Sequence, residues 1–142
     1  MGLEGKTIAI TGAARGLGAA LAIVAADRGM IPLLLGRNAP GIGATADIIE
    51  KRTGRRPDAF VCDLAEPVSL AGAASKITSV CPELDILVNS GSQWVGGAFA
   101  AMTDAQIAAI VDSTVTGTMA LTRRLLPLLL KRQPVTEVRA TS

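Results

Sequence analysis

The chain has 142 residues and a mass of 14.5 kDa, enough for one domain with a sizeable core and too short for two. It contains no histidine and no tyrosine, which excludes His-based acid–base chemistry, a Ser-His-Asp triad and a Tyr-based mechanism. The net charge of +2 is too small to indicate a nucleic-acid-binding protein, although a mild preference for an anionic ligand stays open.

The two cysteines, Cys62 and Cys81, fit neither the spacing of metal ligands nor a disulfide framework, so we expect buried, reduced thiols and no metal. The N-terminus lacks the apolar core and cleavage site of a signal peptide, and the apolar stretch 125–130 is far too short to cross a bilayer. Together these features predict a cytoplasmic protein with no membrane association.

Short apolar runs alternate with alanine-rich stretches along the chain. The runs predict strands at residues 7–11, 31–35, 59–62 and 86–89. The alanine-rich stretches predict helices at 16–28, 42–52, 68–80 and 103–131. Nearly continuous apolar strands separated by helices indicate one α/β domain, built on a parallel sheet that is covered on both faces.

Two helix ends have recognisable caps, and one helix start is poorly defined. Gly29 is a sensible C-cap for the first helix, and Thr103 a sensible N-cap for the last. Pro40, Gly41 and Gly43 crowd the start of the second helix.

A glycine-rich segment, Thr11-Gly12-Ala13-Ala14-Arg15-Gly16-Leu17-Gly18, follows the first strand and opens the first helix. Glycines at such a turn let the backbone approach a pyrophosphate, and the helix N-terminus offers free N–H groups to that anion. This strand–turn–helix context predicts a dinucleotide site. The alternative is a glycine-rich turn that binds no ligand.

The end of the second strand bears on the choice of nucleotide. An NAD site would place a carboxylate there for the ribose hydroxyl, but this chain has Gly36-Arg37-Asn38. Arg37, helped by Arg15 from the glycine-rich segment, suits a 2′-phosphate, so we favour NADP(H) over NAD(H). Alternatively, Arg37 is an ordinary solvated surface residue.

The fourth strand ends at Asn89 and Gly91 beside the first strand, at the switch point where open α/β sheets bind ligands. The segment Ser92–Gly97 then has the composition of a loop next to the substrate. Trp94 could line that pocket, but the interpretation we favour is that it packs the loop down.

Taken together, these motifs resemble the short-chain dehydrogenase/reductase family from about Lys6 to Lys131. The motifs fall in the family's order and spacing: Gly-x-x-x-Gly-x-Gly after Thr11, Cys62-Asp63-Leu64, Asn89-Ser90-Gly91 in place of Asn-Asn-Ala-Gly, and Thr114-Val115-Thr116-Gly117 followed by Leu125-Leu126-Pro127. The resemblance implies a Rossmann-type doubly wound parallel sheet and hydride transfer between a nicotinamide and a small carbonyl or alcohol substrate.

The resemblance also implies which residues hold the cofactor. These come from the glycine-rich segment and the ends of the following strands: Gly12, Arg15, Gly16, Leu17, Gly18, Arg37, Asp63, Leu64, Asn89, Ser90 and Gly91. Asp63 has a second possible role as N-cap of the helix that follows it.

The resemblance fails at the catalytic residues. The family uses a Tyr as proton donor, a Lys four residues later, a Ser that orients the carbonyl, and a supporting Asn on the long helix. Here there is no Tyr, and Thr114 occupies the Asn position. Ser142 would take the Ser position if residues 134–142 form the fifth strand, or it is an ordinary chain end.

Residues 134–142 match a central strand poorly, because Glu137 and Arg139 would share one face. A truncation or a shifted reading frame would produce a similar tail. We therefore expect the sheet to stop after its fourth or fifth strand.

Residues 1–142 are thus interpreted as a single NADP(H)-binding domain of oxidoreductase type, inactive alone. The alternatives are a non-catalytic nucleotide-binding protein and a degenerate, truncated relative. We also expect a homo-oligomer formed through the 103–131 helix, because a second subunit would have to bury its leucines, Leu121, Leu125, Leu128 and Leu129.

Overall fold

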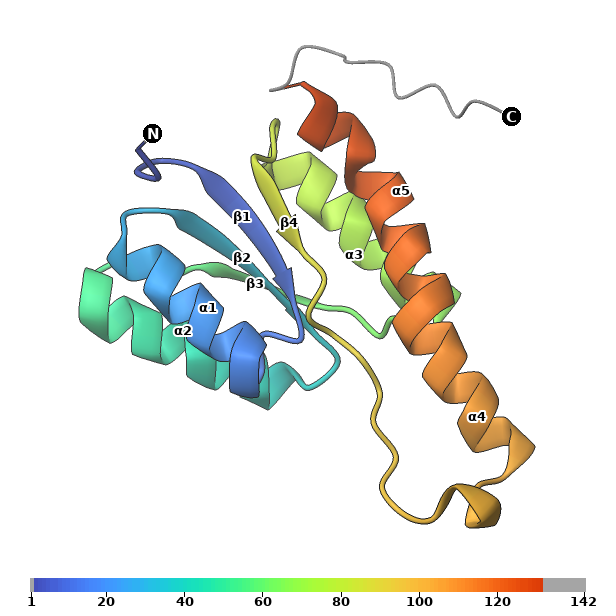
Figure 1. The fold of residues 1–142 in the computed structure, drawn as a ribbon. Helices are drawn as coiled ribbons and strands as arrows, with labels where there is room; N and C mark the ends of the chain where they lie inside the picture. The colour runs from blue at the N-terminus through green and yellow to red at the C-terminus, as the bar shows by residue number, and fades with distance from the viewer. Residues whose placement is uncertain (1, 132–142) are drawn as a thin grey trace.

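A parallel four-stranded sheet lies at the centre of the structure, a computed structural model that describes residues 2–131 (Figure 1). The strands pair in the order β3-β2-β1-β4. Their bounds are β1 (Thr7–Thr11), β2 (Ile31–Gly36), β3 (Asp58–Val61) and β4 (Ile86–Val88). From β1 the chain winds outward to β2 and β3, then returns past β1 to form β4. This is the predicted Rossmann-type, doubly wound arrangement.

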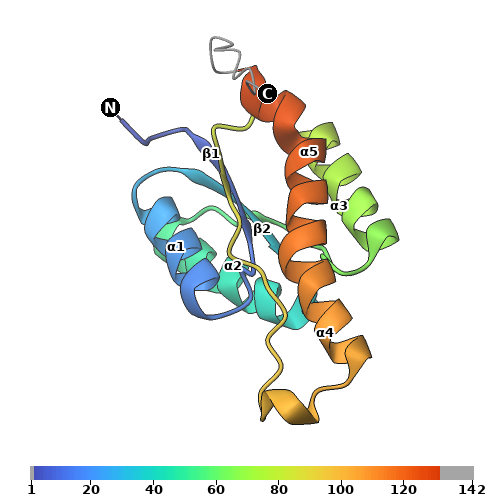
Figure 2. The same ribbon diagram turned by 45° about the vertical axis from the view of Figure 1, so that its right-hand side comes forward.

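Helices cover both faces of the sheet, as Figures 1 and 2 show. On one face lie α1 (Gly16–Asp27) and α2 (Ala39–Thr53), and on the other lie α3 (Pro67–Val80) and α5 (Gly117–Leu130). The predicted 103–131 helix is divided: α4 (Asp104–Val111) continues into α5 through a π-helical turn, η2 (Asp112–Thr116). A short 3-10 helix, η1 (Phe99–Ala101), precedes α4.

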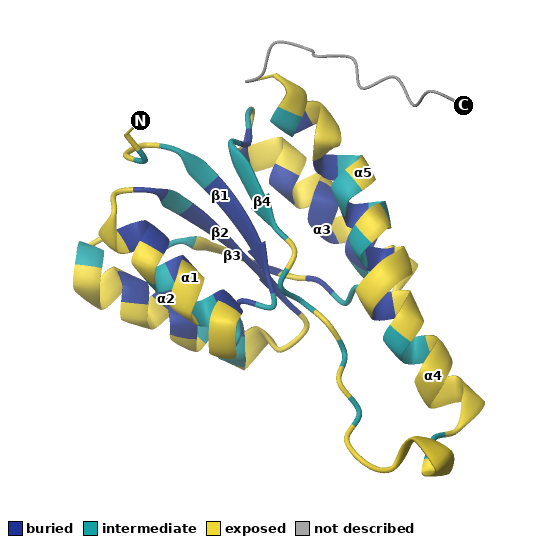
Figure 3. Cartoon of the chain, in the orientation of Figure 1, coloured by how far each residue is buried: buried dark blue, intermediate teal, exposed yellow. Residues whose placement is uncertain are grey.

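Each face of the sheet has its own apolar core (Figure 3). Ile10 and Leu34 pack with α1 and α2, whereas Leu35 and Leu84 pack with α3 and α5. β1 and β2 are buried almost throughout, whereas Phe60 is the one buried residue of the edge strand β3 and the other edge strand, β4, is half-buried. The expectation of a strand covered on both faces is therefore wrong for β3.

The leucines of α5 correct a second expectation. Leu121, Leu125 and Leu128 are buried within this chain, in the core that α5 shares with α3, and Leu129 packs partly against it. A second subunit is not needed to bury these four side chains. Other apolar residues of α4 and α5 are exposed.

The helix ends follow the predicted capping chemistry with one shift. Thr103 and Gln106 form a reciprocal capping box at α4, and Gly29 follows the end of α1 with a φ of 78°. Helix α2 begins at Ala39 instead of residue 42, because the Asn38 side chain accepts a 3.0 Å hydrogen bond from the backbone N–H of Gly41. Pro40 is tolerated in this first turn.

The predicted fifth-strand segment, residues 134–142, lies outside the described residues, and Ser142 with it. Within residues 2–131, no helix combines the length and the apolar character needed to cross a membrane. Both cysteines are buried free thiols, as expected.

Candidate functional site

A cleft of about 800 Å³ opens where the strands end. Residues from the carboxyl ends of all four strands line it, among them Thr11, Gly36, Cys62 and Val88. The cleft includes the point between β1 and β4 where the winding of the sheet reverses, the usual ligand position in open α/β sheets. Its volume is within the range of small-molecule and cofactor sites.

The glycine-rich turn between β1 and α1 lines this cleft and has no room for a side chain at Gly12 or Gly18. A Cβ on Gly12 would lie 2.9 Å from the Gly91 Cα, and a Cβ on Gly18 would lie 2.3 Å from the Gly12 carbonyl oxygen. Gly12 also has a φ of 69°, which disfavours any other residue. The turn therefore presents bare backbone to a ligand in the cleft.

The N-terminus of α1 beside this turn is left uncapped. Its N-cap residue, Arg15, makes no side-chain capping hydrogen bond, and the first turn contains no acidic residue. Helix α4, in contrast, has its first N–H groups satisfied by Thr103 and Gln106. The first N–H groups of α1 and its positive dipole end thus remain available to an anion in the cleft.

Thr11 fixes the opposite wall of the cleft. Its buried hydroxyl oxygen accepts hydrogen bonds from the backbone N–H groups of Ser90 (3.0 Å) and Gly91 (2.8 Å), and it donates to the Val88 carbonyl at 3.4 Å. This one side chain holds the turn after β4 against the end of β1. The turn Asn89-Ser90-Gly91 is therefore hydrogen-bonded directly to Thr11, the first residue of the glycine-rich segment.

Positive charge lies at the outer part of the cleft, where Arg15 and Arg37 both contribute to the lining. The Arg37 guanidinium donates from Nη1 to the Gln93 Oε1 at 3.4 Å. Asn89 donates from its amide Nδ2 to the Thr122 hydroxyl of α5 at 3.2 Å. Two cationic groups and an uncapped helix end make this cleft suited to a phosphorylated ligand.

Asp63 lines the cleft in a tight turn and does not cap a helix. Its Oδ1 accepts a 3.0 Å hydrogen bond from the Ala65 N–H, and its own N–H donates to the Ser69 Oγ at 3.0 Å. The N-cap of α3 is Glu66, so the N-cap interpretation of Asp63 is wrong. The turn places the next residue, Leu64, so close to α5 that a Cβ on Gly117 would lie 2.0 Å from the Leu64 carbonyl oxygen.

The structure brings together every residue that the sequence predicted for cofactor binding. The lining of the cleft includes Gly12, Arg15, Gly16, Leu17, Gly18, Arg37, Asp63, Leu64, Asn89, Ser90 and Gly91. The predicted catalytic residue Thr114 is exposed in η2 and is not part of the lining. Trp94 lines the cleft and is 83% exposed, so the expectation that it packs the loop down is wrong.

Ser113 is a polar residue of the cleft that sequence reasoning missed. Ser113 is buried, and its Oγ accepts a 3.2 Å hydrogen bond from the Gln93 N–H while donating to the Ile110 carbonyl at 3.2 Å. Ser113, and not its neighbour Thr114, lines the cleft. Both residues belong to η2, a π-helical turn of the kind often found at functional sites. No local sequence pattern announces this turn.

The Cys62 thiol also lines the cleft but is not a candidate nucleophile. Burial, together with the neighbouring negative charge of Asp63, raises the pKa of the Cys62 thiol to about 11. The thiol is therefore neutral at ordinary pH, and neutral thiols are poor nucleophiles.

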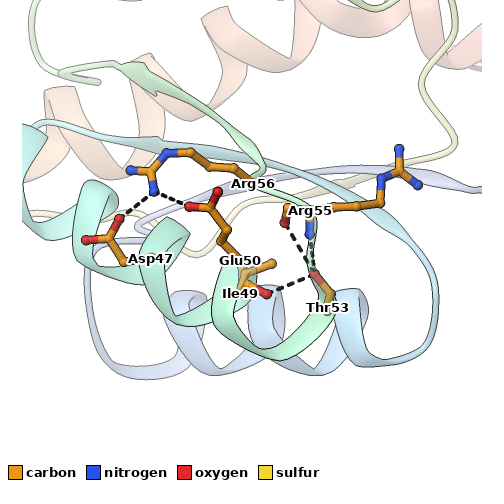
Figure 4. Close-up of polar contacts among 6 residues, drawn as sticks. All are labelled: Asp47, Ile49, Glu50, Thr53, Arg55 and Arg56. Atoms are coloured by element: carbon orange, nitrogen blue, oxygen red, sulfur yellow. Dashed lines mark hydrogen bonds and ion pairs between the residues drawn. The ribbon is translucent and has the colours of Figure 1, made fainter.

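A second cavity, of about 460 Å³, lies at the amino-terminal ends of β2 and β3, among the ends of α1 and α2. Arg52 is paired there with Asp27, and Arg56 with Asp47 and Glu50, as Figure 4 shows for Arg56. These carboxylates already neutralise the two guanidinium groups. Nor does the part of the chain that the structure describes contain a cluster of His, Cys, Asp or Glu that could hold a metal.

Comparison with known proteins agrees with this geometry. The chain matches the short chain dehydrogenase family over residues 6–141, and it belongs to that family. It is 29% identical over 130 residues to the ketoacyl reductase HetN of Nostoc sp. and 34% identical over 131 residues to the oxidoreductase UcpA of Escherichia coli K12. Each alignment covers 92% of this chain.

Among solved structures, L-sorbose reductase from Gluconobacter frateurii, in complex with NADPH and L-sorbose, superposes with a TM-score of 0.84 at 26% identity. This match covers 93% of the present chain and 50% of the reductase. The chain spans 45% of HetN and 49% of UcpA, so it corresponds to about half the length of these relatives.

Proposed function

We propose that residues 1–142 form the NADP(H)-binding domain of a short-chain dehydrogenase/reductase that oxidises or reduces a small alcohol or carbonyl compound. The observation that carries this proposal is the convergence of all eleven predicted cofactor residues on one cleft at the switch point of the sheet. The relatives are named as reductases and oxidoreductases, which favours this function over the non-catalytic and degenerate alternatives.

The residues of the cleft have the chemistry that a dinucleotide needs. The bare backbone at Gly12 and Gly18, together with the uncapped N-terminus of α1, suits a pyrophosphate. Asp63 and the backbone after β4 flank the part of the cleft proposed for the adenosine. When bound, the nicotinamide would supply hydride transfer, and this chain's residues would bind and orient the cofactor.

We favour NADP(H) because the residue after β2 is Arg37 and no carboxylate stands there to accept from a ribose hydroxyl. Arg15 and Arg37 line the same cleft, so both guanidinium groups can contribute to holding a 2′-phosphate. The NADPH bound to L-sorbose reductase supports this choice by analogy.

We further propose that these 142 residues do not turn over substrate alone, since they include no tyrosine to act as proton donor. Thr114 and Ser142 remain proposals for the positions of the family's Asn and Ser. Ser113 is a better-placed hydroxyl than Thr114, because it faces the cleft. Absence of NADPH-dependent carbonyl reduction by a homogeneous preparation is the expected result, and measurable reduction would contradict it.

The outward face of α4 and α5 supports the proposal of a homo-oligomer through residues 103–131. The segment 104–130 exposes a stripe of apolar side chains, several of them four residues apart: Ile107, Val111, Val115, Met119, Leu126 and Leu130. Such a stripe is unfavourable in water and is buried well by a second copy. We also propose a cytoplasmic location, consistent with the two free, buried thiols.

The choice of nucleotide is tested with two matched arginine variants. Arg37→Ala removes a guanidinium from the cleft, whereas Arg55→Ala removes one whose side chain extends away from Asp47 and Glu50 (Figure 4). In calorimetric titrations we expect Arg37→Ala to weaken NADPH binding about tenfold or more, without weakening NADH binding. Arg55→Ala should leave both affinities unchanged. Equal losses for both nucleotides in Arg37→Ala would contradict a role for Arg37 at the 2′-phosphate.

A further inference from the structure

The hydrogen bond between Arg37 and Gln93 crosses the cleft. Arg37 directly follows β2, and Gln93 follows β4, whereas β1 lies between these two strands in the sheet. The contact therefore joins the two sides of the cleft across the end of β1 and the glycine-rich turn. A nucleotide whose pyrophosphate binds at that turn would reach the Arg37–Gln93 hydrogen bond.

Gln93 makes a second hydrogen bond, through its backbone. Its backbone N–H donates to the buried Oγ of Ser113 in the π-helical turn, while its side chain accepts from Arg37. Gln93 thus links the loop after β4 to Arg37, on the α2 side of the sheet, and to Ser113, in the long helix on the other face. The adjacent Trp94 is largely exposed on the same loop.

We propose that the Arg37–Gln93 contact is a latch that holds the loop 92–97 over the cleft and that an entering nucleotide opens. This inference rests on the proposed nucleotide site. A phosphate is a stronger acceptor for a guanidinium than a carboxamide oxygen, so NADPH replaces the lost bond of Arg37 with a better one. NADH lacks that phosphate, so it opens the latch without giving Arg37 a new acceptor.

Truncating the Gln93 side chain tests the latch and leaves the backbone hydrogen bond of Gln93 in place. Gln93→Ala removes the Oε1 acceptor but keeps the backbone N–H that bonds to Ser113. Because the latch is one exposed hydrogen bond, we expect NADH to bind Gln93→Ala and Arg37→Ala about two- to fivefold more tightly than the wild type. The double variant should bind NADH no more tightly than either single variant, since both remove the same contact. Damage to the fold would weaken binding instead.

NADPH distinguishes the two partners. Gln93→Ala should bind NADPH more tightly than the wild type, whereas Arg37→Ala should bind it more weakly because the phosphate contact is lost. Gln93→Glu should weaken both nucleotides, because a carboxylate pairs more strongly with Arg37. Unchanged or weakened binding of both nucleotides by Gln93→Ala would overturn the latch.

Trp94 gives a readout that needs no nucleotide, because it is the only tryptophan in the sequence. Its fluorescence anisotropy should fall in Gln93→Ala and in Arg37→Ala as the loop is released, and Arg55→Ala should leave it unchanged. Failure of the wild type to bind either nucleotide would contradict the proposed function alone. Equal anisotropy in the wild type and both latch variants would overturn the latch by itself.

Discussion

The Thr11 Oγ accepts a 2.8 Å hydrogen bond from the backbone N–H of Gly91, a residue 80 positions later in the chain. The same oxygen accepts from the Ser90 N–H, so one hydroxyl fixes the distance between the ends of β1 and β4. The geometry of the cleft therefore depends on the hydroxyl oxygen of Thr11.

Replacing Thr11 with valine tests this dependence with little change of shape. Thr11→Val leaves the N–H groups of Ser90 and Gly91 without their acceptor, and we expect the free energy of unfolding to fall by about 1–3 kcal/mol. Nucleotide affinity should fall with it. Thr11→Ser retains the oxygen and should lose less stability. A Thr11→Val variant as stable as the wild type in urea denaturation would contradict the role of this oxygen.

Two glycine-to-alanine variants separate the site from general effects of substitution. Gly18→Ala places a Cβ 2.3 Å from the Gly12 carbonyl oxygen, so we expect a loss of about 1–3 kcal/mol and strongly reduced nucleotide binding. Gly72→Ala is the matched control, because an added Cβ in the middle of α3 meets no atom within 4 Å. It should stabilise the protein by about 0.5–1 kcal/mol. Thermal unfolding of both variants, with calorimetric titrations, checks this contrast.

The buried Cys62 thiol predicts a loss of stability at alkaline pH. Its pKa rises to about 11 in the folded chain from an ordinary value of 9.0, so the unfolded chain releases this proton first as the pH increases. The contribution is fully present below pH 9 and is lost between about pH 9 and pH 11, with a size on the order of 2 kcal/mol. Cys62→Ala should show a shallower fall in the free energy of unfolding over this interval, and an identical fall would contradict the assignment.

The exposed apolar stripe of α4 and α5 predicts the oligomeric state. Met119, which is 68% exposed, and Val115 belong to this stripe, whereas Val24 is an exposed apolar residue of α1 on the other side of the sheet. We expect Val115→Lys/Met119→Lys to shift the chain toward a monomer in analytical ultracentrifugation, and Val24→Lys to leave the assembly intact. A wild-type chain that sediments as a monomer would contradict this proposal.

The positions of the helices and strands follow from the local pattern, and so does the lining of the cleft. Continuous apolar runs and glycines with fixed spacing are set by short-range chemistry, which explains why the residues predicted from Gly12 to Gly91 line one cleft. The burial of Leu121, in contrast, depends on how α5 packs against α3, and no local pattern states which face of an apolar helix meets its own chain.

Ser113 and Gln93 show a second limit of sequence reasoning. The family's spacing pointed to Thr114, but Ser113 is the residue of the π-helical turn that lines the cleft. The Arg37–Gln93 contact joins residues 56 positions apart in two loops, so neither residue signals the other. Trp94 was misassigned because a large apolar side chain is usually buried, whereas here the loop leaves it in solvent.

The measurement that tests the central claim most directly is a calorimetric titration of the purified 142-residue chain with NADPH, with NADH alongside. The account predicts saturable binding of one nucleotide per chain, tighter for NADPH than for NADH, because Arg15 and Arg37 line the cleft and no carboxylate follows β2. Absence of binding to both nucleotides by the folded chain would contradict the proposed site.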